Sequence, residues 1–305
     1  MERGDRIGRG LKLKDIHTFR AVVQRRSMAK AAAELALTPP AISKVIGDME
    51  RLLGVRLLER TPQGVEPTAY GEALLKGAIN LFDDLRQTVE QIETLADPTV
   101  GEVRIGTTNP LQGSLLTTVI DGLTRQYPKM VFHVTGASTW AELSGALRAR
   151  SIDVLISRMN MEPEEDLEKE VLFDDPLVVV TGRANPRFRG RSVKLAQLMD
   201  EAWCLPNAQF IRQALRANGL TPSNVCVTCT SLPLQTALAE TGRFFTVVPE
   251  SYLRFRAANA SLRTLALDLH AGIPPVGLAT LKNRSVSPVT SLFIKTIRSV
   301  AKKGK

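Results

Sequence analysis

Apolar residues recur at helical spacing near the start of the chain, and they predict two helices joined by a tight turn. The first helix begins after Ser27, which can cap it, and ends near Leu35. In the second helix, Thr38 occupies the N-cap position and Pro39 the first helical position, where a missing N–H removes no hydrogen bond. One face of this second helix carries an apolar stripe, made of Ile42, Ile46, Met49 and Leu53. We expect that face to pack on a core and to leave the other side free.

The free side of the second helix is small and polar. It presents Pro40, Ser43, Lys44 and Gly47. In a helix-turn-helix protein, the N-terminal part of the second helix enters the major groove of DNA. Ser43 and Lys44 are therefore the leading candidates for DNA contacts, and Pro40 can touch a thymine methyl group or a sugar. The alternative is an ordinary helical hairpin whose outer face is solvated.

Two strand-like runs follow, at residues 55–58 and 65–68, and a turn sequence Thr-Pro-Gln-Gly separates them. They predict a small hairpin, the wing of a winged helix-turn-helix. Arg60 lies at its tip, where it can contact a phosphate or a minor-groove edge; the alternative is a solvated arginine. Together with Thr38 and Pro39 at the start of the second helix, Arg60 completes the predicted set of DNA contacts.

A long helix is predicted over residues 69–96, because its apolar residues alternate in steps of four and three. These residues are Leu74, Ala78, Leu81, Leu85, Thr88, Ile92 and Leu95. This is the a/d spacing of a coiled coil, and so narrow a stripe needs a partner helix. The same helix of a second copy is the simplest partner, so we expect a homodimer that presents two recognition helices to a two-fold DNA site. Residues 97–100 end the helix and are expected to form a hinge.

Beyond residue 101 the period changes, and strand-like runs alternate with helical runs. The expected strands cover 103–107, 131–135, 153–156, 177–180, 203–205, 225–229, 244–248, 262–267 and 276–280. The expected helices cover 110–126, 140–150 and 289–301. Such alternation is typical of a parallel, doubly wound α/β sheet, which we expect to occupy residues 101–305.

Composition supports a DNA-binding N-terminal region. The 305-residue chain has a net charge of +9, and residues 1–66 hold 13 lysines and arginines against 8 acidic residues, a net of +5. Such an excess suits phosphate neutralisation, although it can also serve only solubility. We expect residues 1–12 to be a disordered basic arm, not a secretory signal, and residues 13–68 to be the DNA-binding domain. No apolar run is long enough for a membrane span, and three cysteines, an odd number, favour a reducing cytoplasm.

Residues in and around the predicted hairpin match a known family. They are Ala31-Ala32, Leu35, Thr38-x-Pro40-Ala-Ile-Ser-Lys44, Ile46, Met49-Glu50, Leu53-Gly54-Val-x-Leu57-Leu58-x-Arg60 and Pro67-Thr68-x-x-Gly71. They closely resemble the DNA-binding region of LysR-type transcriptional regulators. Residues 101–305 resemble the effector domain of that family in layout, most recognisably at 103–106, 152–156 and 245–249. Two departures are Pro39, where many relatives carry a glutamine that reads a base, and Leu58, where phenylalanine is usual.

The resemblance implies a homodimer or a homotetramer that binds promoter DNA and responds to a small-molecule effector. RNA polymerase is a further candidate partner. The effector domain of this family is a two-lobed, periplasmic-binding-protein-like fold. Lobe I is expected to comprise 101–161 and 268–305, and lobe II 162–267. The effector is expected between the lobes, at strand ends and helix N-termini.

Seven polar residues are candidates for effector contacts, because the predicted topology places them in this cleft. They are Thr108, Asn109, Ser138, Thr139, Arg158, Asn207 and Gln209. Arg158 can pair with a carboxylate in bidentate fashion, which favours an anionic effector. For each residue the alternative is turn chemistry, helix capping or a structural ion pair.

Cys226-x-x-Cys229 invites a zinc or redox interpretation, but residues three apart on a strand point to opposite faces, and no second ligand pair has zinc-site spacing. We expect both cysteines to be buried apolar residues. The three histidines, His17, His133 and His270, are scattered. Neither a phosphate-binding glycine-rich loop nor a G-x-S-x-G turn is present, so we expect no enzyme, metal or cofactor. The rivals are an enzyme with an acid–base pair in the cleft, and an architectural DNA-binding protein with a vestigial effector domain.

Overall fold

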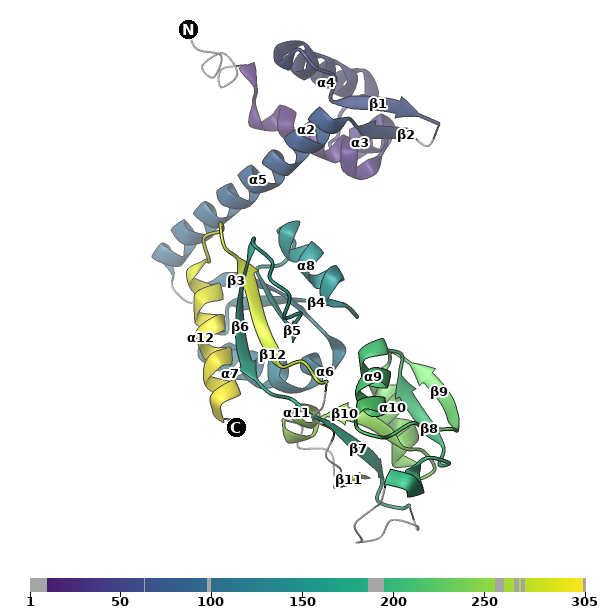
Figure 1. Cartoon of the computed structure of the whole chain (residues 1–305). Coiled ribbons are helices and arrows are strands. Elements are labelled where there is room, and N and C mark those ends of the chain that lie inside the picture. The colour runs from purple at the N-terminus through teal and green to yellow at the C-terminus, as the bar shows by residue number, and fades with distance from the viewer. Residues whose placement is uncertain are drawn as a thin grey trace. The chain divides into compact units, whose positions relative to one another are not determined.

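The computed structural model describes residues 10–62, 64–97, 100–185, 195–255, 261–265, 269 and 272–303. The chain divides into two compact units, Met1–Thr88 and Val89–Lys305 (Figure 1). Residues 1–9 of the predicted basic arm, residues 98–99 of the predicted hinge, His270 and the last two residues of the chain lie outside the described residues.

Three short helices form the head of the first unit. They are α2 (Leu13–Arg25), α3 (Met28–Glu34) and α4 (Pro39–Leu53). The Ser27 hydroxyl accepts a hydrogen bond from the amide of Lys30, and the Thr38 hydroxyl accepts one from the amide of Ala41. Gly54 ends α4 in the left-handed conformation, with φ of 73°. The predicted caps of both helices are therefore confirmed.

The apolar stripe of α4 lies in the core of the head. Ile42, Ile46 and Met49 are buried, and they pack with Ala31 and Ala32 of α3. Small side chains on α3 allow the two helices to approach closely, which is why the hairpin is compact. Leu53, at the end of the stripe, is only partly buried.

The wing consists of two antiparallel strands, β1 (Leu58–Thr61) and β2 (Gly64–Pro67). The first strand begins three residues later than predicted, so most of the run 55–58 is not strand. The reason is that Oε1 of Glu50 accepts hydrogen bonds from the amides of Leu57 and Leu58 at 2.7 and 3.2 Å. These bonds hold the segment just before and at the start of β1 against the end of α4.

The long helix α5 (Ala69–Ala96) has the predicted bounds. Leu74 and Ala78, at its start, pack into the core of the first unit. Further along, the residues of the stripe are exposed in the single chain. Those with large exposed apolar side chains are Leu81, Leu85, Ile92 and Leu95, together with Val89. From Leu81 onward, the helix therefore presents an uncovered apolar edge.

The second unit contains a five-stranded sheet with the order β4-β3-β5-β12-β6. Its strands are β3 (Gly101–Thr107), β4 (Met130–Gly136), β5 (Val154–Arg158), β6 (Leu167–Phe173) and β12 (Val276–Leu281). β3 is parallel to β4 and β5, but β12 is antiparallel to β5 and β6, so the expectation of a parallel sheet is confirmed for β3, β4 and β5 and wrong for β12 and β6. β6 belongs to this sheet, and residues 167–173 are therefore part of lobe I, not lobe II as predicted.

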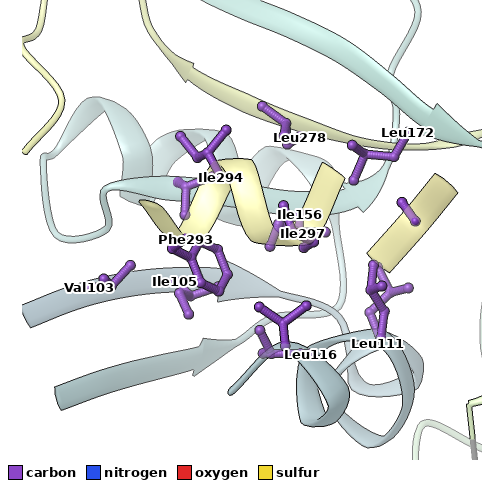
Figure 2. Close-up of a cluster of buried hydrophobic side chains, with 14 of the residues drawn as sticks. Val103, Ile105, Leu111, Leu116, Ile156, Leu172, Leu278, Phe293, Ile294 and Ile297 are labelled. Atoms are coloured by element: carbon purple, nitrogen blue, oxygen red, sulfur yellow. The ribbon is translucent and has the colours of Figure 1, made fainter. Parts of the chain in front are cut away.

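Helices cover both faces of this sheet. On one face, α7 (Thr117–Gln126) and α12 (Pro288–Lys303) enclose an apolar cluster, in which Figure 2 shows Phe293, Ile294 and Ile297 of α12 beside Ile105 and Ile156. On the other face, Leu143 and Leu147 of α8 (Trp140–Arg148) pack on Ile152 and Leu155. α7 follows a short helix, α6 (Asn109–Leu111), and a π-helical turn at Gln112–Leu116.

Lobe II is built on two smaller sheets. Its strands are β7 (Leu177–Gly182), β8 (Trp203–Pro206), β9 (Val225–Cys229), β10 (Thr246–Pro249) and β11 (Leu262–Leu265). Its helices are the 3-10 turn Leu195–Leu198, α9 (Gln209–Ala217), α10 (Leu232–Glu240) and α11 (Glu250–Arg254). β10 and β11 flank β7 in antiparallel fashion, β8 and β9 are parallel, and a bridge between Trp203 and Phe245 links the two sheets.

The cysteines do not lie where the sequence suggested. Cys226 is exposed and Cys229 is half-buried on the edge strand β9, whereas Cys204 on β8 is the buried thiol. The prediction that Cys226 and Cys229 are both buried is therefore wrong, because β9 has a neighbouring strand on one side only. Burial, followed by the neighbouring Cys229, raises the pKa of Cys204 to about 12.

A buried ion cluster joins distant parts of lobe I. Asp153 accepts hydrogen bonds from the amide of Arg104 at 2.8 Å and from Nη2 of Arg284 at 2.6 Å. Burial alone would raise the pKa of Asp153, but the hydrogen bonds and charges of the two arginines outweigh it and hold the pKa below its usual value. Asp153 thus ties β3, the start of β5 and the segment after β12 together.

Asp153→Asn is expected to lower the free energy of unfolding of the second unit by about 3 kcal/mol, because it removes a buried charge that two arginines share. Urea unfolding of the full chain measures this when it is followed by tryptophan fluorescence. Both tryptophans, Trp140 and Trp203, lie in this unit.

Asp121→Asn is the matched control. It removes an ion pair with Arg125 in which both side chains are mostly exposed, and it should change the free energy of unfolding by less than about 0.5 kcal/mol.

The folded pKa of Asp153 is depressed. The contribution of Asp153 to the free energy of unfolding is therefore full above the unfolded pKa of about 4 and is lost as pH falls below it. Equal effects of the two substitutions would contradict this account.

Candidate DNA interface and effector site

The outward face of α4 carries exposed residues with free side chains. Pro39, Pro40, Ser43 and Lys44 are all exposed. Among the described residues, neither Ser43 nor Lys44 has an intramolecular hydrogen bond or ion pair. The hydroxyl of Thr38 accepts the capping bond from Ala41 at 3.3 Å and retains its own proton as a donor.

The chemistry of this face limits which bases it can recognise. Positions 39–47 hold only proline, alanine, isoleucine, serine, lysine, valine and glycine. They therefore include no arginine to form bidentate hydrogen bonds with guanine and no asparagine to form them with adenine. Arg51, further along, is paired with Asp48 at 3.0 Å. What remains is one amine, one hydroxyl and two apolar rings, a set suited to phosphate, a guanine edge and a thymine methyl group.

Close backbone approaches fix the wing and the start of α5 beside α4. A side chain at Gly71 would overlap with the carbonyl oxygen of Leu57, and the Thr68 hydroxyl donates to the carbonyl of Arg56 at 2.7 Å. Sequence reasoning missed the role of Glu50, although its place near the end of α4 and just before the wing was a usable signal. The backbone of Arg60 lies in β1, but its side chain lies outside the described atoms, so its DNA contact stays a prediction.

In the second unit, the first candidate effector residues lie at the start of α6. Thr108 is the N-cap of α6 but makes no side-chain capping bond. Nδ2 of Asn109 donates to the carbonyl oxygen of Thr230, in lobe II, at 3.5 Å. This long hydrogen bond brings α6 of lobe I next to the loop between β9 and α10. Gln112, which the sequence did not single out, lies beside Asn109 near Gly136.

Arg158, the last residue of β5, lies where the lobes meet. Its Nη1 donates to the carbonyl of Pro274 at 2.9 Å and its Nη2 to Asp175 at 3.5 Å. The guanidinium carbon is 6.0 Å from the ring centre of Phe210 in lobe II. Burial lowers the pKa of Arg158, and the charge of Asp175 acts in the opposite direction. A largely buried cation beside a half-exposed ring suits an anion with an apolar part.

Ser138 and Thr139 already have a local function at the start of α8. Thr139 and Glu142 form a capping box, in which the Thr139 hydroxyl accepts from the amide of Glu142. Oε2 of Glu142 in turn accepts from the amide of Ser138 at 2.9 Å and from that of Thr139 at 3.4 Å. An anion at this helix start would have to displace a carboxylate of the chain itself.

The lobe II candidates lie at the ends of β8 and β9. Asn207 is exposed, and its backbone N–H donates to the backbone carbonyl of Cys229 at 2.9 Å. Gln209 is the exposed first residue of α9, whose N-cap position makes no side-chain capping bond. Gln235, not predicted, donates through Nε2 to the same Cys229 carbonyl at 3.1 Å.

The structure thus links two of the predicted residues, Asn109 and Arg158, to lobe II directly. Their lobe II neighbours, Thr230 and Phe210, were not predicted, because a single sequence does not reveal which loops face each other. Within the described residues, no group of three histidine, cysteine or acidic side chains is arranged to hold a metal ion. None of the described helices is long and apolar enough to span a membrane.

Two family models match the chain over these same regions. Residues 13–72 match the model for bacterial regulatory helix-turn-helix proteins of the lysR family. Residues 96–302, more than half of the chain, match the LysR substrate binding domain.

Known regulators match the chain over most of its length. It is 28% identical over 298 residues to the HTH-type transcriptional regulator GbpR of Azospirillum brasilense, covering 95% of this chain and 87% of GbpR. It is 26% identical over 299 residues to the regulator BenM of Acinetobacter baylyi, covering 95% and 96%.

The fold is similar to that of full-length CbnR in a crystal structure with its target DNA. The TM-score is 0.65 at 22% identity, covering 95% of this chain and all of CbnR. The helix-turn-helix head, the long helix and the two-lobed α/β domain therefore occur together in known proteins. The chain belongs to the LysR family of transcriptional regulators, which join a DNA-binding head to an effector-binding domain.

Proposed function

We propose that this LysR-type regulator contacts its promoter through the outward face of α4, with Ser43 and Lys44 as the principal contacts and Pro39 and Pro40 against thymine methyl groups. The observation that carries the proposal is that Ser43 and Lys44 are exposed on the side of α4 opposite its buried stripe, and lack intramolecular partners among the described residues. Thr38 is a further contact through its hydroxyl proton, and Arg60 contacts the backbone of the DNA from the wing.

We further propose that two copies pair along α5 and that dimers associate into a homotetramer. The uncovered apolar edge of α5 supports the pairing, since exposed leucines and isoleucine at a/d positions gain stability only when a second helix covers them. Pairing presents two copies of α4 to a two-fold site, which matches how helix-turn-helix dimers bind.

The proposed effector site lies between lobes I and II, with Thr108, Asn109 and Arg158 on one side and Asn207 and Gln209 on the other. Two polar groups support it, namely the partly satisfied guanidinium of Arg158 and the long hydrogen bond of Asn109. Ser138 and Thr139 are less favoured as effector contacts, since their backbone amides already donate to the carboxylate of Glu142.

In this proposal the effector changes the angle between the lobes, which re-spaces the DNA-binding heads and alters promoter bending. RNA polymerase is the partner through which that change would reach transcription. The relatives named above are transcriptional regulators, and we infer that this chain likewise acts in the cytoplasm without catalytic activity, metal or cofactor.

Lys44→Glu is expected to weaken binding to the chain's own promoter at least about tenfold, because it replaces a phosphate or guanine contact with a repelling charge. Fluorescence anisotropy at one fixed salt concentration measures the dissociation constant. Lys295→Glu makes the same charge change at an exposed position of α12 and is the control. Equal losses in both variants, or none in Lys44→Glu, would refute the proposed DNA face.

Replacing a half-site thymine by uracil removes only its methyl group. Where that methyl packs on Pro39 or Pro40, affinity should fall about threefold to fivefold, since a buried methyl contributes about 0.8 kcal/mol. In Pro40→Ala, the ratio of the affinities for the thymine and uracil half-sites should be smaller than in the wild type. Uracil substitutions that leave affinity unchanged throughout the half-site would rule out the methyl contact.

Ile92→Glu is expected to shift the chain from dimer or tetramer toward monomer, because it places a charge in the pairing edge of α5. Light scattering after size-exclusion chromatography measures the mass. Glu93→Lys alters the charge on the neighbouring outer face and should leave the mass unchanged. An unchanged mass for Ile92→Glu would exclude pairing along α5.

A further inference from the structure

Two residues of the head lie in backbone conformations that suit a different amino acid. Arg26 follows α2 with φ of 49°, the left-handed conformation in which glycine is the usual residue at a helix end. Gly47 lies inside α4, where alanine is more favourable than glycine. Each residue therefore makes folding of the head less favourable than glycine at position 26 or alanine at position 47 would.

The fold of the head does not require a glycine at position 47. The φ angle of Gly47 is not in the left-handed region, and a Cβ there would meet no atom within 4 Å. Gly54 and Gly71 of the same unit differ in this respect. Gly54 ends α4 with a positive φ, and a side chain at Gly71 would overlap with the carbonyl oxygen of Leu57. The chain therefore has a structural reason for glycine at 54 and 71 but not at 47.

The side chain of Arg26 is available to a partner outside the chain. Arg26 is exposed, and within the ranges that the structure describes its guanidinium makes no hydrogen bond, ion pair or ring contact. The preceding arginine, Arg25, instead pairs with Glu34. No interaction of the Arg26 side chain in the described structure therefore offsets its unfavourable backbone conformation.

Both residues lie on or beside the elements that the proposed function places on DNA. Gly47 is three residues after Lys44 and four after Ser43, so it lies on the same side of α4. The carbonyl of Arg26 accepts a hydrogen bond from the amide of Val65 in β2 at 3.0 Å, which holds Arg26 against the wing. A guanidinium binds phosphate well, and a glycine allows another molecule to approach the backbone closely.

We propose that Arg26 binds a DNA phosphate beside the wing, and that Gly47 lets the sugar–phosphate backbone lie closer to α4 than a methyl group would allow. Both residues thus lower the stability of the free head and raise its affinity for promoter DNA. The inference rests on the proposed DNA face of α4 and adds two positions to it. One of them acts through charge, and the other acts through the absence of a side chain.

Arg26→Gly and Gly47→Ala should each stabilise the head and weaken promoter binding. The most protected amides of α2 in the free protein should exchange with deuterium about twofold to fivefold more slowly in each variant. Binding to a duplex of the chain's own promoter, measured by fluorescence anisotropy, should weaken about threefold to tenfold in each variant.

A salt series separates the two roles. Arg26→Gly should reduce the slope of the logarithm of the association constant against the logarithm of the salt concentration by about 1, because one phosphate contact is lost. Gly47→Ala removes no charge and should leave this slope unchanged. Arg26→Lys keeps the charge and should also keep the slope.

Matched controls lie in the second unit. Arg150 has a φ of 54°, so Arg150→Gly makes the same change of charge and backbone outside the head. Gly122 lies in α7, and a Cβ there would likewise meet no atom within 4 Å, so Gly122→Ala matches Gly47→Ala. Neither control should alter the affinity for the promoter or its salt dependence.

Promoter binding as tight as that of the wild type in either head variant would overturn the proposal. Weaker binding without slower exchange would also overturn it, since the residue would then serve the fold, and so would an equal loss of affinity in a head variant and its control. Lys44→Glu tests the proposed DNA face separately. If Lys44→Glu weakens binding while Arg26→Gly and Gly47→Ala do not, the proposed function stands and only this inference fails.

Discussion

The close packing of α4 on α3 is the constraint on which the DNA-binding face depends. Ala31 and Ala32 have almost no exposed surface, and their small side chains let α4 bury Ile42, Ile46 and Met49. Burying three large apolar side chains contributes several kcal/mol, roughly 1.5–3 each, and it fixes the rotation of the helix about its axis. Once that rotation is fixed, Ser43 and Lys44 can only point outward.

Two buried arginine–carboxylate contacts in the second unit differ in how tightly the arginine holds the carboxylate. Asp153 receives short, charge-assisted bonds of 2.6 to 2.8 Å from Arg284 and Arg104, which lock lobe I together. Arg158 and Asp175 are 3.5 Å apart, and the carboxylate is better served by a serine. The first contact holds its carboxylate tightly and the second holds it loosely, and they lie at opposite ends of β5.

Much of the fold was predictable, because it follows from local patterns. The caps at Ser27 and Thr38, the span of α5 and most strands of the second unit follow from periodicity and turn chemistry. β6 was missed because its charged residues mask the strand pattern, and the antiparallel direction of β12 depends on long-range pairing. Arg158 was found as a cation at a strand end, whereas Phe210 and Asp175 became visible only when the tertiary structure brought them beside it.

A direct test of the central claim places a thiol on the outward face of α4. A Cβ at Gly47 would meet no atom within 4 Å, so Gly47→Cys can be accommodated there. The rate of maleimide alkylation of that thiol is measured with and without saturating promoter DNA, and the exposed Cys226 of the effector domain serves as the internal reference. Strong protection at position 47 with an unchanged rate at Cys226 is the predicted result. An unchanged rate at position 47 on saturated DNA would contradict the account.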